Sequence, residues 1–126
     1  MNKLLYKDLV YDVVGCAMDV HSELGSGFLE AVYEEALCIV LEKKNIPFEL
    51  QKRLKIKFQG EFLKSEYVAD LVVYNKIIVE LKAVSNLKDV YTAQVLNYLK
   101  ATGLNVGLLI NFGGDSLFWK RYALSH

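Results

Sequence analysis

The chain has 126 residues, of which 53% are hydrophobic and 24% are charged. This length suits one folded domain, residues 1–126, with its own core, and the composition argues against intrinsic disorder. No apolar run approaches the roughly 20 residues that a membrane-spanning helix requires, so a membrane partner is not expected. The formal net charge of zero argues against a uniformly basic nucleic-acid binder.

The first eight residues lack the apolar core and the cleavage site of a signal peptide, so we expect a cytoplasmic protein. The two cysteines, Cys16 and Cys38, fall within predicted helices and lack CxxC or CxxH spacing. We interpret them as buried free thiols rather than a disulfide or a zinc site.

Charge is distributed unevenly along the chain. Residues 1–42 contain two lysines against eight acidic residues, whereas residues 43–64 contain seven basic residues against two acidic ones. A polyanion would therefore meet the second segment, although the solvated face of an ordinary protein produces the same asymmetry.

Apolar residues recur at helical spacing in the first third of the chain. They predict one helix over about residues 6–24 and another over about residues 28–44, separated by Gly25-Ser26-Gly27. Pro47 follows the second helix closely and cannot continue it, so that helix is expected to end before the proline.

From Phe48 onward the apolar period changes to two, which predicts strands. Apolar residues then alternate with basic ones, the pattern of a half-buried strand with a basic outer face: Leu54, Ile56 and Phe58 against Arg53, Lys55 and Lys57. A turn at residues 59–61 leads into a short strand over 62–66. Two further runs, 68–74 and 77–83, flank Asn75-Lys76 and predict a β-hairpin.

After this hairpin, Asn86 is expected to cap a third helix that ends at Gly103. Residues 105–112 and 117–122 then predict two strands. The predicted order is ααββββαββ, and it favours an α/β fold in which helices flank a mixed β-sheet.

The hairpin carries three charged residues, and these are the strongest candidates for chemistry: Asp70, Glu80 and Lys82. Glu80 and Lys82 share one strand face about 7 Å apart, because side chains alternate. A carboxylate in so apolar a strand is costly unless it is paired or holds a cation. We predict that the two acids converge on a divalent metal, beside a lysine that orients or deprotonates a water. The alternative is a plain Glu–Lys pair on an exposed strand face.

Glu30 is a further candidate, on the second predicted helix. It shares helical spacing with an apolar stripe, so it is predicted to face the core and to need a partner there: Tyr33, Leu37 and Leu41. The alternative is a glutamate at the edge of the stripe that reaches water.

Gln94 and Tyr98 lie one turn apart on the third predicted helix, with Tyr91 on the same face. They would hold a phosphate or a metal-bound water, or else form a packed tyrosine face beside a solvated glutamine. His21, near the apolar side of the first helix, is interpreted as a structural residue rather than a ligand.

Together these motifs resemble the GxxExxY family, a small bacterial and archaeal group within the PD-(D/E)XK nuclease superfamily. The resemblance extends from the first helix to the strand at 105–112. It rests on four motifs in order: Gly27-x-x-Glu30-x-x-Tyr33, Asp70, Glu80-x-Lys82 and Gln94-x-x-x-Tyr98. The last motif also resembles the exonuclease branch of the superfamily. One departure is that Ala69 precedes Asp70 where the superfamily pattern has proline.

The resemblance implies a restriction-endonuclease-like fold and hydrolysis of DNA phosphodiester bonds by an activated water. It implies that Asp70, Glu80 and the backbone carbonyl of Leu81 ligate Mg²⁺ or Mn²⁺, with Glu30 binding the ion directly or through water. Lys82 would position the attacking water. The phosphate side of the substrate would be held by two residues, Gln94 and Tyr98.

The basic footprint of the sequence consists of four residues: Lys52, Arg53, Lys55 and Lys57. Lys55 and Lys57 share a strand face and are expected to contact a nucleic-acid backbone, weakly and with strong salt dependence. A homodimer would double this footprint. The alternative function is a catalytically silent module of the same fold that binds nucleic acid or a protein partner.

Overall fold

The computed structural model describes residues 5–126. The described helices and strands, in chain order, are α1 (Lys7–Leu24), α2 (Glu30–Lys43), β1 (Phe48–Phe58), β2 (Glu61–Val73), β3 (Ile77–Lys82), α3 (Asp89–Thr102), β4 (Val106–Asn111) and β5 (Phe118–Ala123). Within residues 5–126, no helix is long and apolar enough to cross a membrane. The prediction about a signal peptide concerns residues 1–8, of which residues 1–4 lie outside the described part.

The strands form one mixed sheet in the order β1-β2-β3-β4-β5. The central pair, β3 and β4, is parallel and is connected through α3, whereas the other neighbouring pairs are antiparallel. Every residue of β4 is buried, and so are four of the six residues of β3. Strands covered on both faces need this apolar composition, which agrees with their central position.

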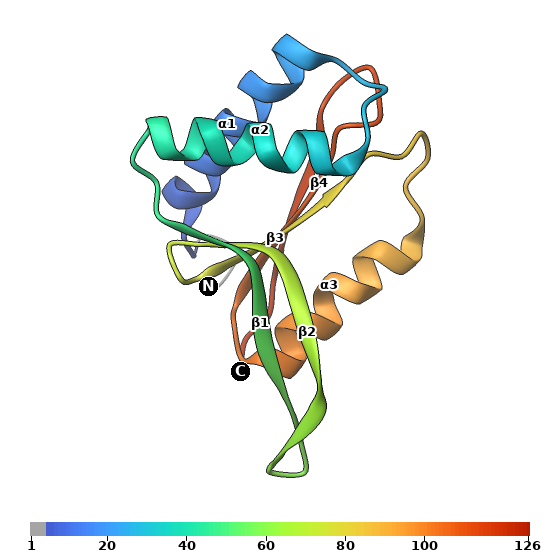
Figure 1. The fold of residues 1–126 in the computed structure, drawn as a ribbon. Coiled ribbons are helices and arrows are strands. Elements are labelled where there is room, and N and C mark those ends of the chain that lie inside the picture. The colour runs from blue at the N-terminus through green and yellow to red at the C-terminus, as the bar shows by residue number, and fades with distance from the viewer. Residues whose placement is uncertain (1–4) are drawn as a thin grey trace.

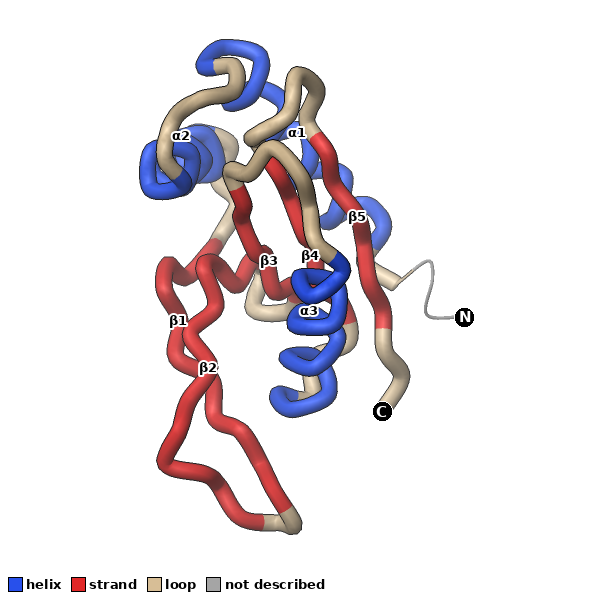
Figure 2. The backbone as a smooth tube through the Cα atoms, turned by 90° about the vertical axis from the view of Figure 1, so that its right-hand side faces the viewer, coloured by secondary structure: helices blue, strands red, loops and turns tan. Residues whose placement is uncertain are grey.

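Helices cover both faces of the sheet (Figures 1 and 2). On one face, α1 and α2 form a core with Leu71, Val79 and Ile110 of the sheet. On the other face, α3 packs its Val95 and Leu99 against the sheet. This arrangement confirms the predicted α/β class with a mixed sheet between helices.

Strands β1 and β2 extend beyond the sheet as a two-stranded arm, which we define as residues 53–66. Figures 1 and 2 show the arm pointing away from α1 and α2. All residues from 57 to 65 are exposed, so strand pairing rather than burial holds this part together. The predicted separate strand over 62–66 is wrong, because β2 runs unbroken through it for 13 residues. The observed order is therefore ααβββαββ.

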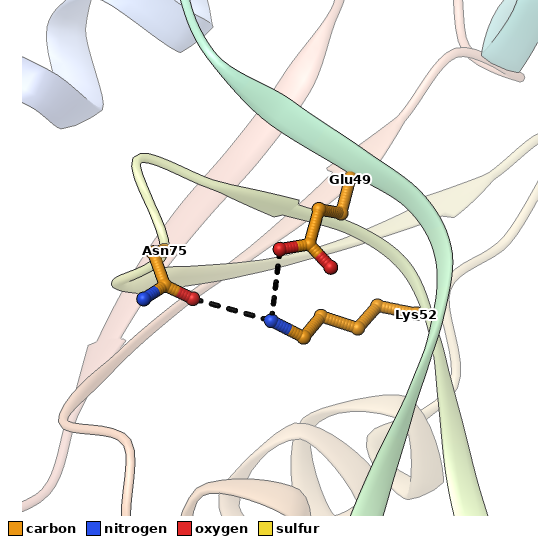
Figure 3. A network of polar contacts seen from close by, with 3 residues as sticks. All are labelled: Glu49, Lys52 and Asn75. Atoms are coloured by element: carbon orange, nitrogen blue, oxygen red, sulfur yellow. Dashed lines mark hydrogen bonds and ion pairs between the residues drawn. The ribbon is translucent and has the colours of Figure 1, made fainter.

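The root of the arm is fixed by Lys52. Its Nζ donates hydrogen bonds to Glu49 Oε1 at 3.0 Å and to Asn75 Oδ1 at 3.2 Å (Figure 3). These contacts tie β1 to the turn between β2 and β3. Lys52 is therefore held against the protein, and it is less exposed than Arg53, Lys55 and Lys57 of the arm.

The start of α3 differs from the prediction. The helix begins at Asp89 after Lys88, with no side-chain hydrogen bond at its N-cap, so Asn86 is not its capping residue. Its end was predicted correctly, since Gly103 adopts a left-handed conformation with φ of 80°.

Candidate active site

The site lies where strands β2 and β3 stop pairing. Their ladder ends at the Leu71–Val79 pair, and Asp70 and Glu80 would form the next pair if it continued. On the other side of β2, the pairing with β1 skips Asp70 and the opposing Gln51, whose φ is 49°. Strand β2 is irregular here, and Asp70 sits at the irregularity.

Asp70 and Glu80 hydrogen-bond across this opening. The backbone N–H of Asp70 donates to Glu80 Oε1 at 3.3 Å, and the backbone N–H of Leu81 donates to Asp70 Oδ2 at 2.8 Å. Each carboxylate thus accepts a hydrogen bond from a backbone N–H at a position where strand pairing is interrupted. The structure brings together the two acids that the sequence singled out.

The backbone carbonyl of Leu81 faces the same opening. In a β-strand the N–H and C=O of one residue point to the same side, and the Leu81 N–H points to Asp70. The next carbonyl, that of Lys82, points the other way and accepts the N–H of Phe112 at 2.8 Å. Leu81 therefore presents an oxygen beside the two carboxylates.

Glu80 has a strongly perturbed acidity. Its burial raises its pKa to about 7, and the negative charge of Asp70 adds to this effect. Hydrogen bonds from the Tyr67 hydroxyl and the Asp70 N–H, together with the charge of Lys82, act in the opposite direction. Near neutral pH this carboxyl group exchanges its proton easily.

Tyr67 links Glu80 to helix α3. Its hydroxyl donates a hydrogen bond to Glu80 Oε1, and its ring stacks on Tyr98 with centroids 3.5 Å apart. Burial raises the pKa of the Tyr67 phenol and the neighbouring Glu80 raises it further, so the phenol remains a donor. This role could not be predicted from the sequence, because it depends on contacts with β3 and α3 that form only on folding.

Lys82 lies on the same strand face as Glu80, but within residues 5–126 the two form no ion pair. The Lys82 Nζ lies 4.5 Å from the centre of the Tyr91 ring instead. Glu80 and Lys82 are both partly buried. The alternative of a plain Glu–Lys pair on an exposed face therefore does not describe this site.

Glu30 does not face the core, contrary to the prediction. Helix α2 begins at Glu30, so the buried stripe starts only at Tyr33 and Glu30 stays exposed. Nearby protein atoms still displace enough water to raise the pKa of Glu30, and the charge of Asp70 raises it further while Lys82 opposes. Glu30 is thus within electrostatic range of both residues.

Glu34 is a site residue that the sequence reasoning missed. Partial burial raises its pKa, and the charges of Asp70 and Glu30 contribute in the same direction. Its Oε2 accepts a hydrogen bond from Gln51 Nε2 at 2.8 Å, beside the irregularity at Asp70. The spacing of four residues from Glu30 was the available signal, since it places both acids on one helix face.

The remaining candidates are divided between the site and the arm. Gln94 is half-buried on α3, one turn before Tyr98 and its stack on Tyr67. Lys55 and Lys57 are not beside Asp70; they lie on the arm, where Lys55 pairs with Glu66 at 3.0 Å.

His21 is structural, as interpreted from the sequence. It is only 8% exposed, and its Nε2 donates to the carbonyl oxygen of Gly114 at 2.9 Å.

The oxygen atoms at the opening suit a magnesium-like ion. Among residues 5–126, no group of three or more His, Cys, Asp or Glu side chains is placed to hold a metal by itself. Mg²⁺ usually takes one or two carboxylates and completes its shell with water and phosphate oxygens. Asp70, Glu80 and the Leu81 carbonyl fit that requirement, and a cation would offset both the burial of the Glu80 charge and its repulsion from Asp70, which raise the pKa of Glu80.

In this mixed sheet, the antiparallel pair β2–β3 opens at two facing carboxylates, and a lysine follows two residues after the second one. This arrangement is that of the restriction-endonuclease-like class of α/β folds. The chain belongs to the PD-(D/E)XK nuclease superfamily, since the model of that family matches residues 7–122.

Among solved structures, the chain is similar to one titled "Crystal structure of SSO0001", with a TM-score of 0.57 and 19% sequence identity. The match covers 76% of this chain but 50% of that chain, and it supports the fold alone. A search of curated proteins found no match.

Proposed function

We propose that this protein is a metal-dependent nuclease that hydrolyses phosphodiester bonds of DNA with an activated water. One observation carries the proposal: Asp70 and Glu80 meet where β2 and β3 separate, with the charge of Lys82 close enough to act on Glu80. Membership of the superfamily supports the same chemistry.

In this proposal Asp70, Glu80 and the Leu81 carbonyl hold Mg²⁺ or Mn²⁺. The bound ion would offset the negative charge that develops on the phosphate. Glu30 lies within electrostatic range of Asp70 and would bind the ion through water. Gln94 and Tyr98, on the neighbouring face of α3, would hold the phosphate side of the substrate.

Lys82 would orient the attacking water by a hydrogen bond from its ammonium group to the water oxygen. The water oxygen forms a bond to phosphorus, and the bond from phosphorus to one deoxyribose oxygen breaks. That oxygen leaves with a proton, so the products are one hydroxyl end and one phosphomonoester end.

Titration calorimetry with Mn²⁺ tests the metal site. The wild type should bind the ion, whereas Asp70→Asn and Glu80→Gln should bind it at least about tenfold more weakly. Glu66→Gln is the matched control, because Glu66 is an acid on the arm that pairs with Lys55. Equal binding by all four proteins would eliminate the proposed site.

Cleavage assays test the catalytic role. Plasmid and linear DNA with Mn²⁺ should be cut by the wild type and not by Lys82→Ala, whose metal binding should persist. Cleavage retained by Lys82→Ala would mean that another group activates the water.

The second candidate function is a catalytically silent module of this fold that binds nucleic acid or a protein. The basic arm supports it, since Arg53, Lys55 and Lys57 are exposed there. Metal binding and DNA binding without cleavage of any substrate would favour this candidate.

Several finer assignments belong to the proposal as well. They are membership of the GxxExxY group, DNA rather than RNA as the substrate, a homodimer that doubles the basic surface, and a cytoplasmic location. The motif Gly27-x-x-Glu30-x-x-Tyr33 supports the first, because Tyr33 stacks on Phe112 and bonds to the carbonyl of Gly25, which fixes the start of α2.

A further inference from the structure

A surface hollow of about 460 Å³ lies between the arm and the last turn of α3. Its lining includes Phe62 and Leu54 together with the lysines at positions 55, 57 and 100. No acidic side chain is among the described residues that line it. The hollow is therefore lined by both apolar and positively charged side chains.

The groups in this hollow are available to a ligand. Phe62 is 63% exposed, which is unusual for a large aromatic side chain on a protein surface. The Nζ of Lys57 lies 5.3 Å from the centre of the Phe62 ring. Among the ion pairs of residues 5–126, one engages Lys55, but none engages Lys57 or Lys100.

The hollow is connected to the site at Asp70 and Glu80 through one layer of side chains. Leu54 of the hollow is the cross-strand partner of Tyr67, which donates to Glu80. On the helix side, Tyr98 stacks on Tyr67, and the Thr102 hydroxyl at the edge of the hollow donates to the Tyr98 carbonyl at 2.7 Å. A surface path from the two carboxylates to Phe62 would follow the outside of this layer, because Tyr67 itself is only 6% exposed.

The length of the path suits an extended polymer. Asp70 and Phe62 are eight residues apart on β2, which corresponds to about 26 Å at about 3.3 Å per residue. An exposed aromatic ring offers a base a stacking partner, and lysines beside it offer charge to phosphates. In a blunt duplex the bases are already stacked on one another, so a duplex would not use Phe62.

We propose that the DNA bound by this protein has a single-stranded segment, which runs from the Asp70–Glu80 opening into this hollow. One base stacks on Phe62, and Lys57 and Lys100 contact the adjacent phosphates. This inference rests on the proposed function, because it names the substrate class of the same site. A second copy of the chain, whose acidic first 42 residues would face the basic arm, is the competing occupant.

Binding without cleavage tests the inference directly. The probe is a short fluorescein-labelled oligothymidylate, compared by fluorescence anisotropy with a blunt duplex of the same length, in EDTA. Phe62→Ala should bind the oligothymidylate about tenfold more weakly, the loss expected for one stacked base. Its affinity for the duplex should stay unchanged.

Phe62→Leu and Phe62→Trp separate stacking from simple apolar contact. The leucine variant should bind as weakly as the alanine variant, and the tryptophan variant should bind like the wild type with quenched fluorescence of the new indole. An unchanged affinity of Phe62→Ala, or equal losses on both probes, would overturn the inference. Thermal unfolding checks that each variant is folded.

The lysines are tested by salt dependence. Replacing both Lys57 and Lys100 by alanine should reduce the slope of log affinity against log salt by about 1.4 for the single strand, since each phosphate contact contributes about 0.7. Lys43→Ala, an exposed lysine in the last turn of α2, should leave the slope unchanged.

Sedimentation of the same variants decides between the two occupants. Loss of a dimer in the Lys57→Ala/Lys100→Ala variant, with unchanged oligothymidylate binding, would overturn the inference and make the hollow a contact between copies. Phe62-dependent binding by a protein that never cleaves DNA would support the inference and refute the proposed nuclease. Cleavage that is independent of Phe62 would refute the inference and support the proposed nuclease.

Discussion

Asp70 and Glu80 each accept a hydrogen bond from a backbone N–H on the other's strand, at the point where β2 and β3 separate. The two side chains therefore complete the local structure as well as forming the candidate metal site. Removal of either side chain leaves a partly buried N–H without its acceptor, which is destabilising. For this reason the isosteric variants Asp70→Asn and Glu80→Gln are better probes of function than alanine variants.

Glu80 should make the metal-free protein less stable as the pH rises. The folded protein holds this proton up to about pH 7, whereas the unfolded chain releases it near pH 4.5. The stability from Glu80 is therefore full below pH 4.5 and is lost between pH 4.5 and 7, by about 3 kcal/mol. Urea unfolding at a series of pH values in EDTA measures this loss.

The Glu80→Gln variant should lack most of this pH dependence. Glu66→Gln should retain it, because the hydrogen bond from Lys55 lowers the pKa of Glu66 and moves its titration out of this range. The same slope in wild type and Glu80→Gln would show that Glu80 does not titrate near neutrality.

Divalent metal should stabilise the protein, and more strongly at pH 8 than at pH 6. The ion binds the deprotonated carboxylate, so it competes with the proton that Glu80 retains to about pH 7. At a free Mn²⁺ concentration of about 100 times Kd, the free energy of unfolding should rise by about 2.7 kcal/mol. Thermal unfolding with and without Mn²⁺ measures the effect, which should disappear in Glu80→Gln.

Tyr67→Phe should shift metal binding to higher pH. The Tyr67 hydroxyl lowers the pKa of Glu80, so its removal raises that pKa above about 7 while the ring can still stack on Tyr98. Titration of Mn²⁺ binding against pH should show a midpoint about one unit higher.

Tyr74→Phe is the matched control for this shift. It removes a hydroxyl that donates to Asp12 on the protein surface. If both variants shifted the midpoint equally, the hydrogen bond between Tyr67 and Glu80 would not be the cause.

Gly113→Ala should destabilise the protein by about 3 kcal/mol or more. A Cβ at this position would lie 2.2 Å from the carbonyl oxygen of Val84, which follows the end of β3 closely. Asn111 holds the same segment, since its side chain exchanges hydrogen bonds of 3.0 and 2.9 Å with the Val84 backbone. Urea unfolding measures the loss.

Gly15→Ala, a glycine-to-alanine change at another position, should instead stabilise the protein. Gly15 lies within α1, with nothing within 4 Å of the added Cβ. Alanine should stabilise the helix there by about 1 kcal/mol. A stable Gly113→Ala variant would mean that the segment around Val84 moves freely.

The sequence predicted the parts of the fold that depend on local patterns. Apolar residues at helical spacing located α1 and α2, and Pro47 marked the end of α2. The turn at Asn75 was found because residues of positive φ favour asparagine, and Tyr74 and Asn75 both adopt it. The mixed sheet followed from the order of these elements.

The errors arose where burial does not accompany secondary structure. β2 was divided in two because its first half is exposed on both faces whereas its second half is largely buried, so the residue pattern changes within one strand. Glu30 was placed in the core because it shares helical spacing with the apolar stripe, but as the first residue of α2 it stays exposed. Both errors concern how far burial extends along an element, which local spacing does not locate.

The candidate site was only partly visible in the sequence. Asp70, Glu80 and Lys82 were conspicuous as charges in apolar strands. Tyr67 and Glu34 were not, since their roles arise from contacts with α3 and with Gln51 that form only on folding. Local sequence thus indicates the reactive groups better than the groups that tune them.

Strand β1 is an outer strand of the sheet, so one row of its backbone donors and acceptors has no neighbouring strand in the described chain. Such an edge invites pairing with another molecule, and charged side chains are the usual protection. Arg53, Lys55 and Lys57 alternate along it with apolar residues, one of which, Phe58, is 60% exposed. Neutralising all three basic residues should therefore make the chain prone to form fibres, whatever it does to substrate binding.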